Sequence, residues 1–129
     1  MLIRFAQNKD IPGMIDLLKQ VGQVHHDIRP DIFQPACQKY DEAALTELLK
    51  DKSRPIFIAE GDGKVLGYCF CILEEVKGNT VLCDAKTLYI DDLCVDENIR
   101  GQHIGRQLYE YVVDFARKSG CYNVTLNVW

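Results

Sequence analysis

The stretch from Asp91 to Arg106 carries the residues most able to do chemistry, because an apolar strand pattern leads there into a glycine-bearing loop that opens a long helix. The loop contains Arg100, Gly101, Gly105 and Arg106. Glycines let backbone N–H groups turn toward one point, and a helix start adds about half a positive charge, so the pattern is typical of a phosphate-binding element. The structural alternative is that Gly101 makes a tight turn and Gly105 allows close packing of the helix on the strand.

Neither the histidines nor the cysteines form a pattern that predicts a metal site. In His25-His26-Asp27 three adjacent polar residues cannot all reach one ion without strain, and no fourth ligand is placed. The six cysteines show no C-x-x-C pair and no zinc-site spacing. Cys69 and Cys71 would share one face of a strand with Cα atoms about 6.5–7 Å apart, near the upper limit of disulfide geometry. We expect buried, reduced thiols, no metal and a cytoplasmic protein.

Composition limits the classes of partner. The chain has 129 residues, enough for one domain, and a formal net charge of −4 argues against a nucleic-acid protein that relies on a general basic field. Neither a signal peptide nor a run of about 18 apolar residues is present, so we expect no membrane span. Cationic small molecules remain plausible partners.

Several helices and strands must position the reactive stretch, and the spacing of apolar residues along the chain predicts where each one lies. A strand at Leu2–Ala6 precedes a helix that Asn8 or Asp10 caps and whose apolar positions run from Ile11 to Val21. The following segment, 22–40, is predicted to be a loop with short helical turns. The later elements are a helix from the cap Asp41 to Lys50, strands at 56–60 and 65–73 joined by Gly61-Asp62-Gly63, a strand at 88–95, a helix at 104–119 ended by Gly120, and a strand from Asn123 to Trp129.

The stretch from Leu88 to Gly105 resembles the acetyl-CoA signature of the GNAT family of N-acetyltransferases, whose loop reads [Q/R]-x-x-G-x-[G/A]. Arg100 matches the first position and Gly105 the last, whereas His103 stands where the middle glycine is expected. The order of elements also agrees with the family over nearly the whole chain. The resemblance implies an α/β (α+β) fold with a mixed, mostly antiparallel central sheet flanked by helices, of the acyl-CoA N-acyltransferase type. It also implies a single N-acetyltransferase domain over 1–129 that ends before the family's C-terminal helix and strand.

The resemblance further implies which residues bind acetyl-CoA. The strand at Leu93–Val95 would pair with the pantetheine arm, a backbone N–H near Leu93 or Cys94 at a strand bulge would polarise the thioester carbonyl, and the loop N–H groups would hold the pyrophosphate. The implied cofactor-binding residues are Leu93, Cys94, Val95, Arg100, Gly101, Gln102, His103, Ile104, Gly105 and Arg106.

The catalytic and acceptor residues are implied less directly. A proton acceptor is needed because amines are protonated near pH 7, and Asp92, with Asp91 second, stands where many members of the family carry a carboxylate. Adjacent strand residues point to opposite faces, so we expect only one of the two aspartates to face the cleft. Charges solvated at a strand end are the alternative. The resemblance implies that His25, His26 and Phe33 line the acceptor site, with a solvated loop as the alternative. No tyrosine, Tyr109 included, is assigned as general acid.

The leading hypothesis is an acetyl-CoA-dependent N-acetyltransferase that acts by direct transfer in a ternary complex. Its acceptor is expected to be a primary amine on a small molecule, polyamine-like or aminoglycoside-like, or on a protein. One alternative is a catalytically impaired CoA-binding or regulatory module that keeps the cofactor loop but has lost turnover through His103 and the missing C-terminal segment. Another is a domain fragment that forms a homodimer through an unfinished sheet edge.

Overall fold

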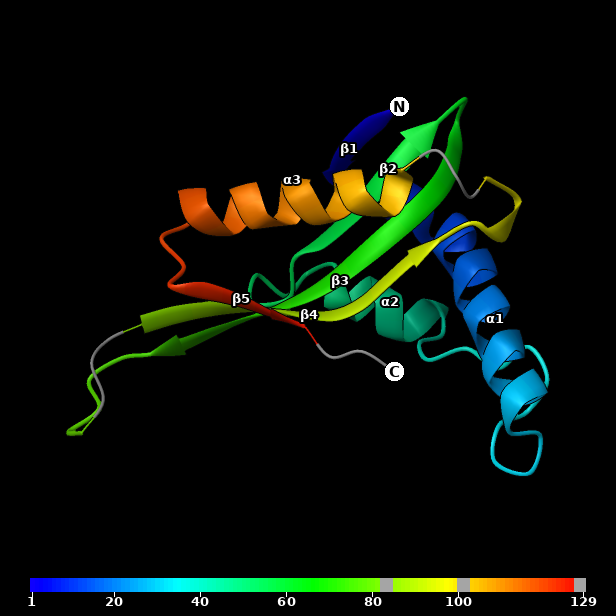
Figure 1. Cartoon of the computed structure of the whole chain (residues 1–129), viewed down its shortest axis with the longest axis horizontal. Coiled ribbons are helices and arrows are strands. Elements are labelled where there is room, and N and C mark those ends of the chain that lie inside the picture. Colours follow the sequence, from blue (N-terminus) through cyan, green and yellow to red (C-terminus); the bar gives the residue numbers. More distant parts are fainter. Residues whose placement is uncertain (82–84, 100–102, 127–129) are drawn as a thin grey trace.

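In the computed structural model, which describes residues 1–81, 85–99 and 103–126, the strands form one sheet with helices on both faces (Figure 1). The strand order is β1-β2-β3-β4-β5; β1 to β4 pair antiparallel, and β5 pairs parallel to β4. This confirms the predicted mixed, mostly antiparallel sheet. The elements are β1 Leu2–Phe5, α1 Ile11–Ile28, α2 Glu42–Leu48, β2 Ile56–Gly61, β3 Lys64–Val76, β4 Ala85–Val95, α3 Ile104–Lys118 and β5 Asn123–Leu126, with 3₁₀ turns at Asn8–Asp10 and Glu97–Ile99.

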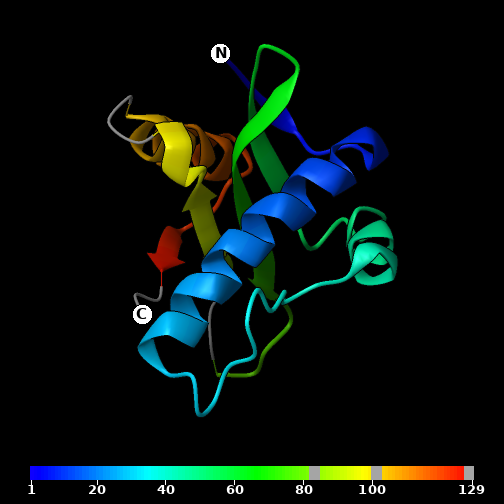
Figure 2. The ribbon, with the colours of Figure 1, turned by 90° about the vertical axis from the view of Figure 1, so that its right-hand side faces the viewer.

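The sheet separates two apolar cores because alternate strand residues face opposite sides. One core packs α3 against the sheet, and the other packs α1 and α2 against the opposite face, as Figure 2 shows from the side of α1. On β2, Phe57 and Ala59 face α3, whereas Ile56 and Ile58 face α1. Both faces of the central strands are therefore buried, which fixes the register of β3 and β4 beneath the helices.

Several local predictions are confirmed. Asp41 caps α2 by accepting a hydrogen bond from the N–H of Ala44 at 2.7 Å. Asp62 and Gly63 both have positive φ in the turn between β2 and β3, as a two-residue hairpin of this kind requires. Gly120 follows α3 with φ of +80°. Each of these positions carried a residue type whose backbone preference matches the observed conformation.

The segment after α1 differs from the prediction. We expected a loop from Gly22, but α1 continues without a break to Ile28. Gly22 is buried in the helix, and a Cβ added there would lie 1.5 Å from the carbonyl oxygen of Cys37. Gly22 therefore serves close packing of the returning chain on α1 and does not end the helix. As a result, His25 and His26 lie on the last turns of α1.

No helix in the described ranges is both long and apolar enough to cross a membrane.

Candidate active site

The sheet carries a β-bulge at Asp91, and this bulge defines the site. Phe70 on β3 pairs with Asp92, the next residue Cys71 pairs with Ile90, and Asp91 is left without a partner in the β3–β4 register. A bulge of this kind turns two successive residues toward the same face. The expectation that only one aspartate faces the cleft is therefore wrong, because Asp91 and Asp92 both face α1. The bulge was expected at Leu93 or Cys94, but it lies at Asp91, two residues before Leu93.

Both aspartates line a cavity of about 330 Å³ between the end of α1, the chain that returns from it and β4. We call it the α1–β4 cavity. Its walls combine apolar and polar groups: Leu18, Val21, Gly22, His25, Phe33, Cys37, Gln38, Lys39, Asp91 and Asp92. The His25 ring stacks on Phe33 with centroids 5.0 Å apart. Of the predicted acceptor-site residues, the structure thus brings His25 and Phe33 to the aspartates.

The remaining predicted acceptor residue, His26, does not line the cavity. Its Nδ1 lies 2.7 Å from the carbonyl oxygen of Phe33, so it ties the returning chain to the end of α1. Two further contacts hold the same segment: Ala36 donates its N–H to Oε1 of Gln23 at 2.8 Å, and the Cys37 thiol lies 3.5 Å from the carbonyl oxygen of Gly22. The wall of the α1–β4 cavity is therefore fastened to the helix at several points.

Asp92 is the half-buried carboxylate of the pair. Tyr68, which is completely buried on β3, donates its hydroxyl to Oδ2 of Asp92 at 2.9 Å. Burial raises the pKa of Asp92 above its usual value, and the hydrogen bond from Tyr68 and the charge of Lys39 only partly offset that rise. A carboxylate whose pKa is raised is a stronger base, so Asp92 is better suited than an ordinary aspartate to accept a proton near neutral pH.

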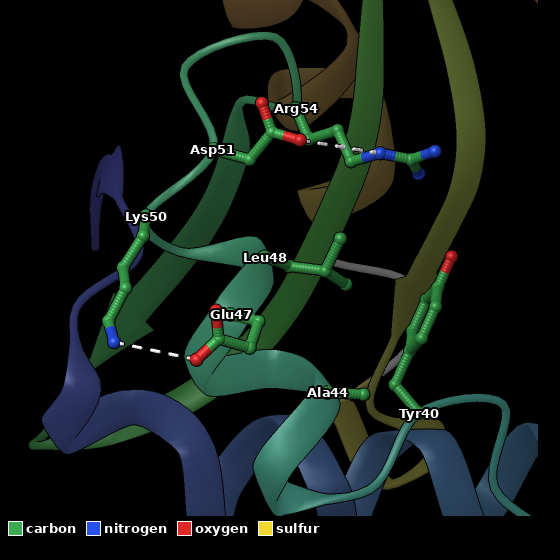
Figure 3. A pocket seen from close by; sticks show the side chains of 7 residues that line it. All are labelled: Tyr40, Ala44, Glu47, Leu48, Lys50, Asp51 and Arg54. Atoms are coloured by element: carbon green, nitrogen blue, oxygen red, sulfur yellow. Dashed lines mark hydrogen bonds and ion pairs between the residues drawn. The ribbon is translucent and has the colours of Figure 1, made fainter.

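Asp91 is engaged by two donors from the segment before α2. Lys39 places its Nζ 2.8 Å from Oδ2 of Asp91, and the Tyr40 hydroxyl donates to the same oxygen at 3.1 Å. The Tyr40 ring also borders a second, open hollow of about 780 Å³ beside α2, where its hydroxyl points away from α2 (Figure 3). The charged groups of that hollow pair with one another, Lys50 with Glu47 and Arg54 with Asp51. Tyr40 thus borders this hollow and binds Asp91, which lines the α1–β4 cavity.

Beyond the bulge, one edge of β4 is open in the described part of the chain. The described residues of β5 pair with residues 87–90 of β4 and end opposite Ile90 (Figure 1). Among the described strands, Leu93 and Val95 are in register with β3 alone. This leaves the outer backbone of β4 able to pair with an extended ligand beside the two aspartates, as the resemblance implies for a pantetheine arm.

The start of α3 lies against the end of that edge. Gly105 packs over Val95, and among the described residues an added Cβ would meet the Val95 side chain alone, at 3.4 Å. Ile104 is buried beneath the helix, whereas Arg106 is exposed and pairs with Glu110 at 3.1 Å. The predicted contacts of Arg100, Gly101 and Gln102 lie outside the described residues. Gly105 therefore adds no side chain at the start of α3, where the resemblance implies that the diphosphate binds.

His103, which replaces the glycine expected in the middle of the loop, has φ of 59° and ψ of 25°. This left-handed conformation is the one that glycine adopts without cost and that most other residues avoid. The backbone shape of the position is thus retained although the side chain is not glycine, and the exposed imidazole stands at the N-cap of α3.

Three residues that contact the aspartates were not predicted from the sequence: Lys39, Tyr40 and Tyr68. Lys39 and Tyr40 lie in a segment without periodicity, and Tyr68 reads as one more apolar strand residue. The bulge itself had a detectable signal. Leu88 and Ile90 face α3, as do Leu93 and Val95, so the apolar spacing of two becomes three across Asp91 and Asp92. In the described ranges no group of three or more His, Cys, Asp or Glu side chains could hold a metal ion.

Comparison with known proteins shows which family this sequence matches. The family model described as the acetyltransferase (GNAT) family matches residues 20–129. Among curated proteins, glucosamine 6-phosphate N-acetyltransferase of Arabidopsis thaliana is 29% identical over 80 residues, which cover 52% of this chain and 51% of the relative. The match thus spans about half the length of that relative.

Solved structures share the fold over the whole chain. A variant of the BH1408 protein of Bacillus halodurans superposes with a TM-score of 0.88 at 26% identity, covering 100% of this chain and 83% of the other. The glucosamine-6-phosphate N-acetyltransferase of Arabidopsis thaliana gives a TM-score of 0.74 at 20% identity, covering 99% of this chain and 82% of the other. At that identity the likeness concerns the fold alone.

Proposed function

The chain belongs to the GNAT acetyltransferase family, and from this premise we propose that it transfers the acetyl group of acetyl-CoA directly to a primary amine bound in the α1–β4 cavity. The observation that carries the proposal is the bulge at Asp91, which turns two adjacent carboxylates into one cavity next to an open strand edge. A cationic amine is the ligand that such a pair attracts. The curated relative is named as an N-acetyltransferase, which agrees with an amine acceptor.

In this proposal the outer edge of β4 and the start of α3 hold the coenzyme. In the described part of the chain Leu93 and Val95 pair with β3 alone, which leaves this edge for the pantetheine arm, and the N-terminus of α3 offers N–H groups and a positive dipole to the diphosphate. Acetyl-CoA, when bound there, supplies an acetyl group activated as a thioester. The role of His103 is to supply the left-handed backbone that the family's loop obtains from glycine. That retained shape favours a working loop over the impaired module.

Asp92 acts on the acceptor. An amine enters as an ammonium ion, and only its neutral form has the electron pair that attacks a carbonyl carbon. Asp92 accepts the proton, for which its raised pKa suits it, while Tyr68 holds the carboxylate in place from β3. Asp91 is already neutralised by Lys39 and acts by orienting the amine.

The apolar part of the cavity indicates what kind of body the amine carries. Leu18, Val21 and the stacked pair His25 and Phe33 form its walls. A small amine with a hydrocarbon or ring body would bury that body against these side chains while its nitrogen meets Asp92. The inference favours a compact amine over a highly charged polyamine, since Lys39 already uses one of the two carboxylates.

The test measures thiol release from acetyl-CoA across a panel of primary amines, with the wild-type chain and the matched variants Asp92→Asn and Asp91→Asn. We expect turnover to fall more in Asp92→Asn and its pH dependence to flatten, because that variant lacks the proton acceptor. The opposite ranking would move the role of base to Asp91. Calorimetric binding of acetyl-CoA without thiol release for any amine would instead favour a regulatory CoA-binding module.

A further inference from the structure

Lys39 lies in the α1–β4 cavity, at the place where the ammonium group of the proposed acceptor is expected. Its Nζ is 2.8 Å from Oδ2 of Asp91, and Asp92 is the next residue on β4. Lys39 lines the same cavity as both carboxylates. A primary amine of the protein itself therefore already makes the contact that an external amine would make.

The position of Lys39 is built into the site. Its Nζ lies 5.5 Å from the centroid of the Tyr40 ring, and the Tyr40 hydroxyl binds the same oxygen of Asp91. The preceding residues are fastened to α1 through the contact of Cys37 with Gly22. By contrast, Lys50 pairs with Glu47 on the surface of α2, at 3.5 Å and with both side chains largely exposed. Lys39 is thus positioned, while its side chain remains 47% exposed and able to move.

We propose that Lys39 is an acetylation site of this chain, modified in cis by acetyl-CoA bound at the β4 edge. The inference rests on the proposed function, because it uses the same coenzyme and the same carboxylates. The Lys39 Nζ, once neutral, forms a bond to the acetyl carbonyl carbon, and the bond from that carbon to the CoA sulfur breaks. The proton of the attacking amine passes to Asp92, and CoA leaves as a thiolate that takes a proton from solvent.

The charge of the pair sets the speed of this step. Partial burial would lower the pKa of Lys39, but Asp91 raises it above its usual value, so only a small fraction of the amine is neutral near pH 7. Modification in cis is therefore slow and accelerates as the pH rises. Once acetylated, Lys39 carries no charge, its ion pair with Asp91 is lost, and the α1–β4 cavity holds two carboxylates without an internal cation. Acetylation therefore makes the cavity more negative and strengthens its attraction for a cationic acceptor.

The experiment incubates the purified chain with acetyl-CoA carrying an isotopically labelled acetyl group, at pH 7 and pH 9, and maps labelled lysines by peptide mass spectrometry. We expect Lys39 to be labelled at least about tenfold faster than the exposed Lys19 and Lys52, at a rate that does not change when the protein is diluted. Equal labelling of the three lysines would overturn the proposal, and so would a rate that falls on dilution.

Two variants and one binding measurement separate this inference from the function on which it rests. Gly105→Trp places a large side chain at the start of α3, so Lys39 should then be labelled no faster than the surface lysines. Labelling of Lys39 at the wild-type rate in this variant would show direct reaction with free acetyl-CoA and overturn the proposal. Lys39→Arg keeps a cation beside Asp91 and should remove the label at position 39, while Lys19 and Lys52 are still labelled at their slow rate. If calorimetry shows that acetyl-CoA binds and amines are acetylated, but Lys39 is not labelled preferentially, the inference fails alone. Absence of acetyl-CoA binding would overturn both.

Discussion

Replacing Tyr68 by Phe should raise the pKa of Asp92. The variant deletes one hydroxyl, which in the wild-type chain donates to Oδ2 of Asp92 at 2.9 Å, and leaves a ring that fits the same buried place on β3. Burial already raises the pKa of Asp92, and the Tyr68 hydrogen bond lowers it by stabilising the charged form. Removing that bond leaves the effect of burial less opposed.

The effect of this variant on the free energy of unfolding follows from the geometry of the hydrogen bond. A hydrogen bond to a charged group contributes about 1.5–3 kcal/mol, and Asp92 is only half-buried, so the lower end of that range applies. Loss of that hydrogen bond removes stabilisation of the charged carboxylate and so raises the pKa of Asp92 further. Because the folded-state pKa of Asp92 lies above its unfolded value, its favourable contribution to stability is present at low pH and is lost as the pH rises through the folded pKa. We therefore expect Tyr68→Phe to unfold more easily than the wild type at pH 7, by about 1.5 kcal/mol, and the difference to shrink toward pH 4.

Carbon NMR of selectively labelled aspartate measures the pKa directly and needs no acceptor. Tyr40→Phe is the matched control, because it removes a hydroxyl that binds Asp91 rather than Asp92 and should move the pKa of Asp92 less. An Asp92 pKa that is unchanged or lowered in Tyr68→Phe would contradict the role of this hydroxyl. Once an acceptor is known, the acidic limb of the kcat/KM profile should shift upward by the same amount.

Further variants test the local structure, each by denaturant unfolding. His103→Val should lower the free energy of unfolding by about 1–2 kcal/mol, because a β-branched residue resists φ of 59°, whereas His103→Gly should not lower it; equal losses in both would contradict the left-handed conformation. Gly22→Ala should cost more than about 2 kcal/mol, since its Cβ would lie 1.5 Å from the carbonyl oxygen of Cys37, and wild-type stability would mean that the chain does not cross α1 there. Asp10→Asn should cost roughly 3 kcal/mol at pH 7. Burial alone would raise the pKa of Asp10, but hydrogen bonds from Arg4 hold it below its usual value, so this stabilisation is lost as the pH falls through the folded pKa; a cost that persists at low pH would argue against the ion pair.

The sequence predicts elements well where local backbone preference and apolar spacing agree. The Asp62-Gly63 turn and the Asp41 cap are examples, because each depends on the conformational preference of one or two residues. The helix after the signature loop is predicted from Ile104 onward for the same reason, since its apolar face repeats at helical spacing and Gly120 ends it.

Gly22 shows where that reasoning fails. A glycine in a helical pattern costs about 1 kcal/mol and reads as a helix end, but here a tertiary contact with Cys37 requires it, and no local pattern reports such a contact. For the same reason Lys39 and Tyr68 could not be assigned to the site, because their contacts with the aspartates join β3, β4 and the segment after α1.

The bulge at Asp91 lies between these two cases. The change of apolar spacing from two to three between Ile90 and Leu93 is visible in the sequence and indicates that the strand alternation is interrupted. Strict alternation led to the wrong expectation that Asp91 and Asp92 face apart. Reading the phase of the apolar residues on both sides of the acidic pair would have placed both carboxylates on one face.

The most direct test of the account is a crystal structure of the chain with acetyl-CoA. We predict that the pantetheine arm pairs with residues 93–95 of β4, that the diphosphate lies at the start of α3 beside Gly105, and that the acetyl group faces Asp92 and Lys39 in the α1–β4 cavity. Coenzyme bound anywhere else, or an acetyl group on the far side of the sheet from the two aspartates, would contradict it.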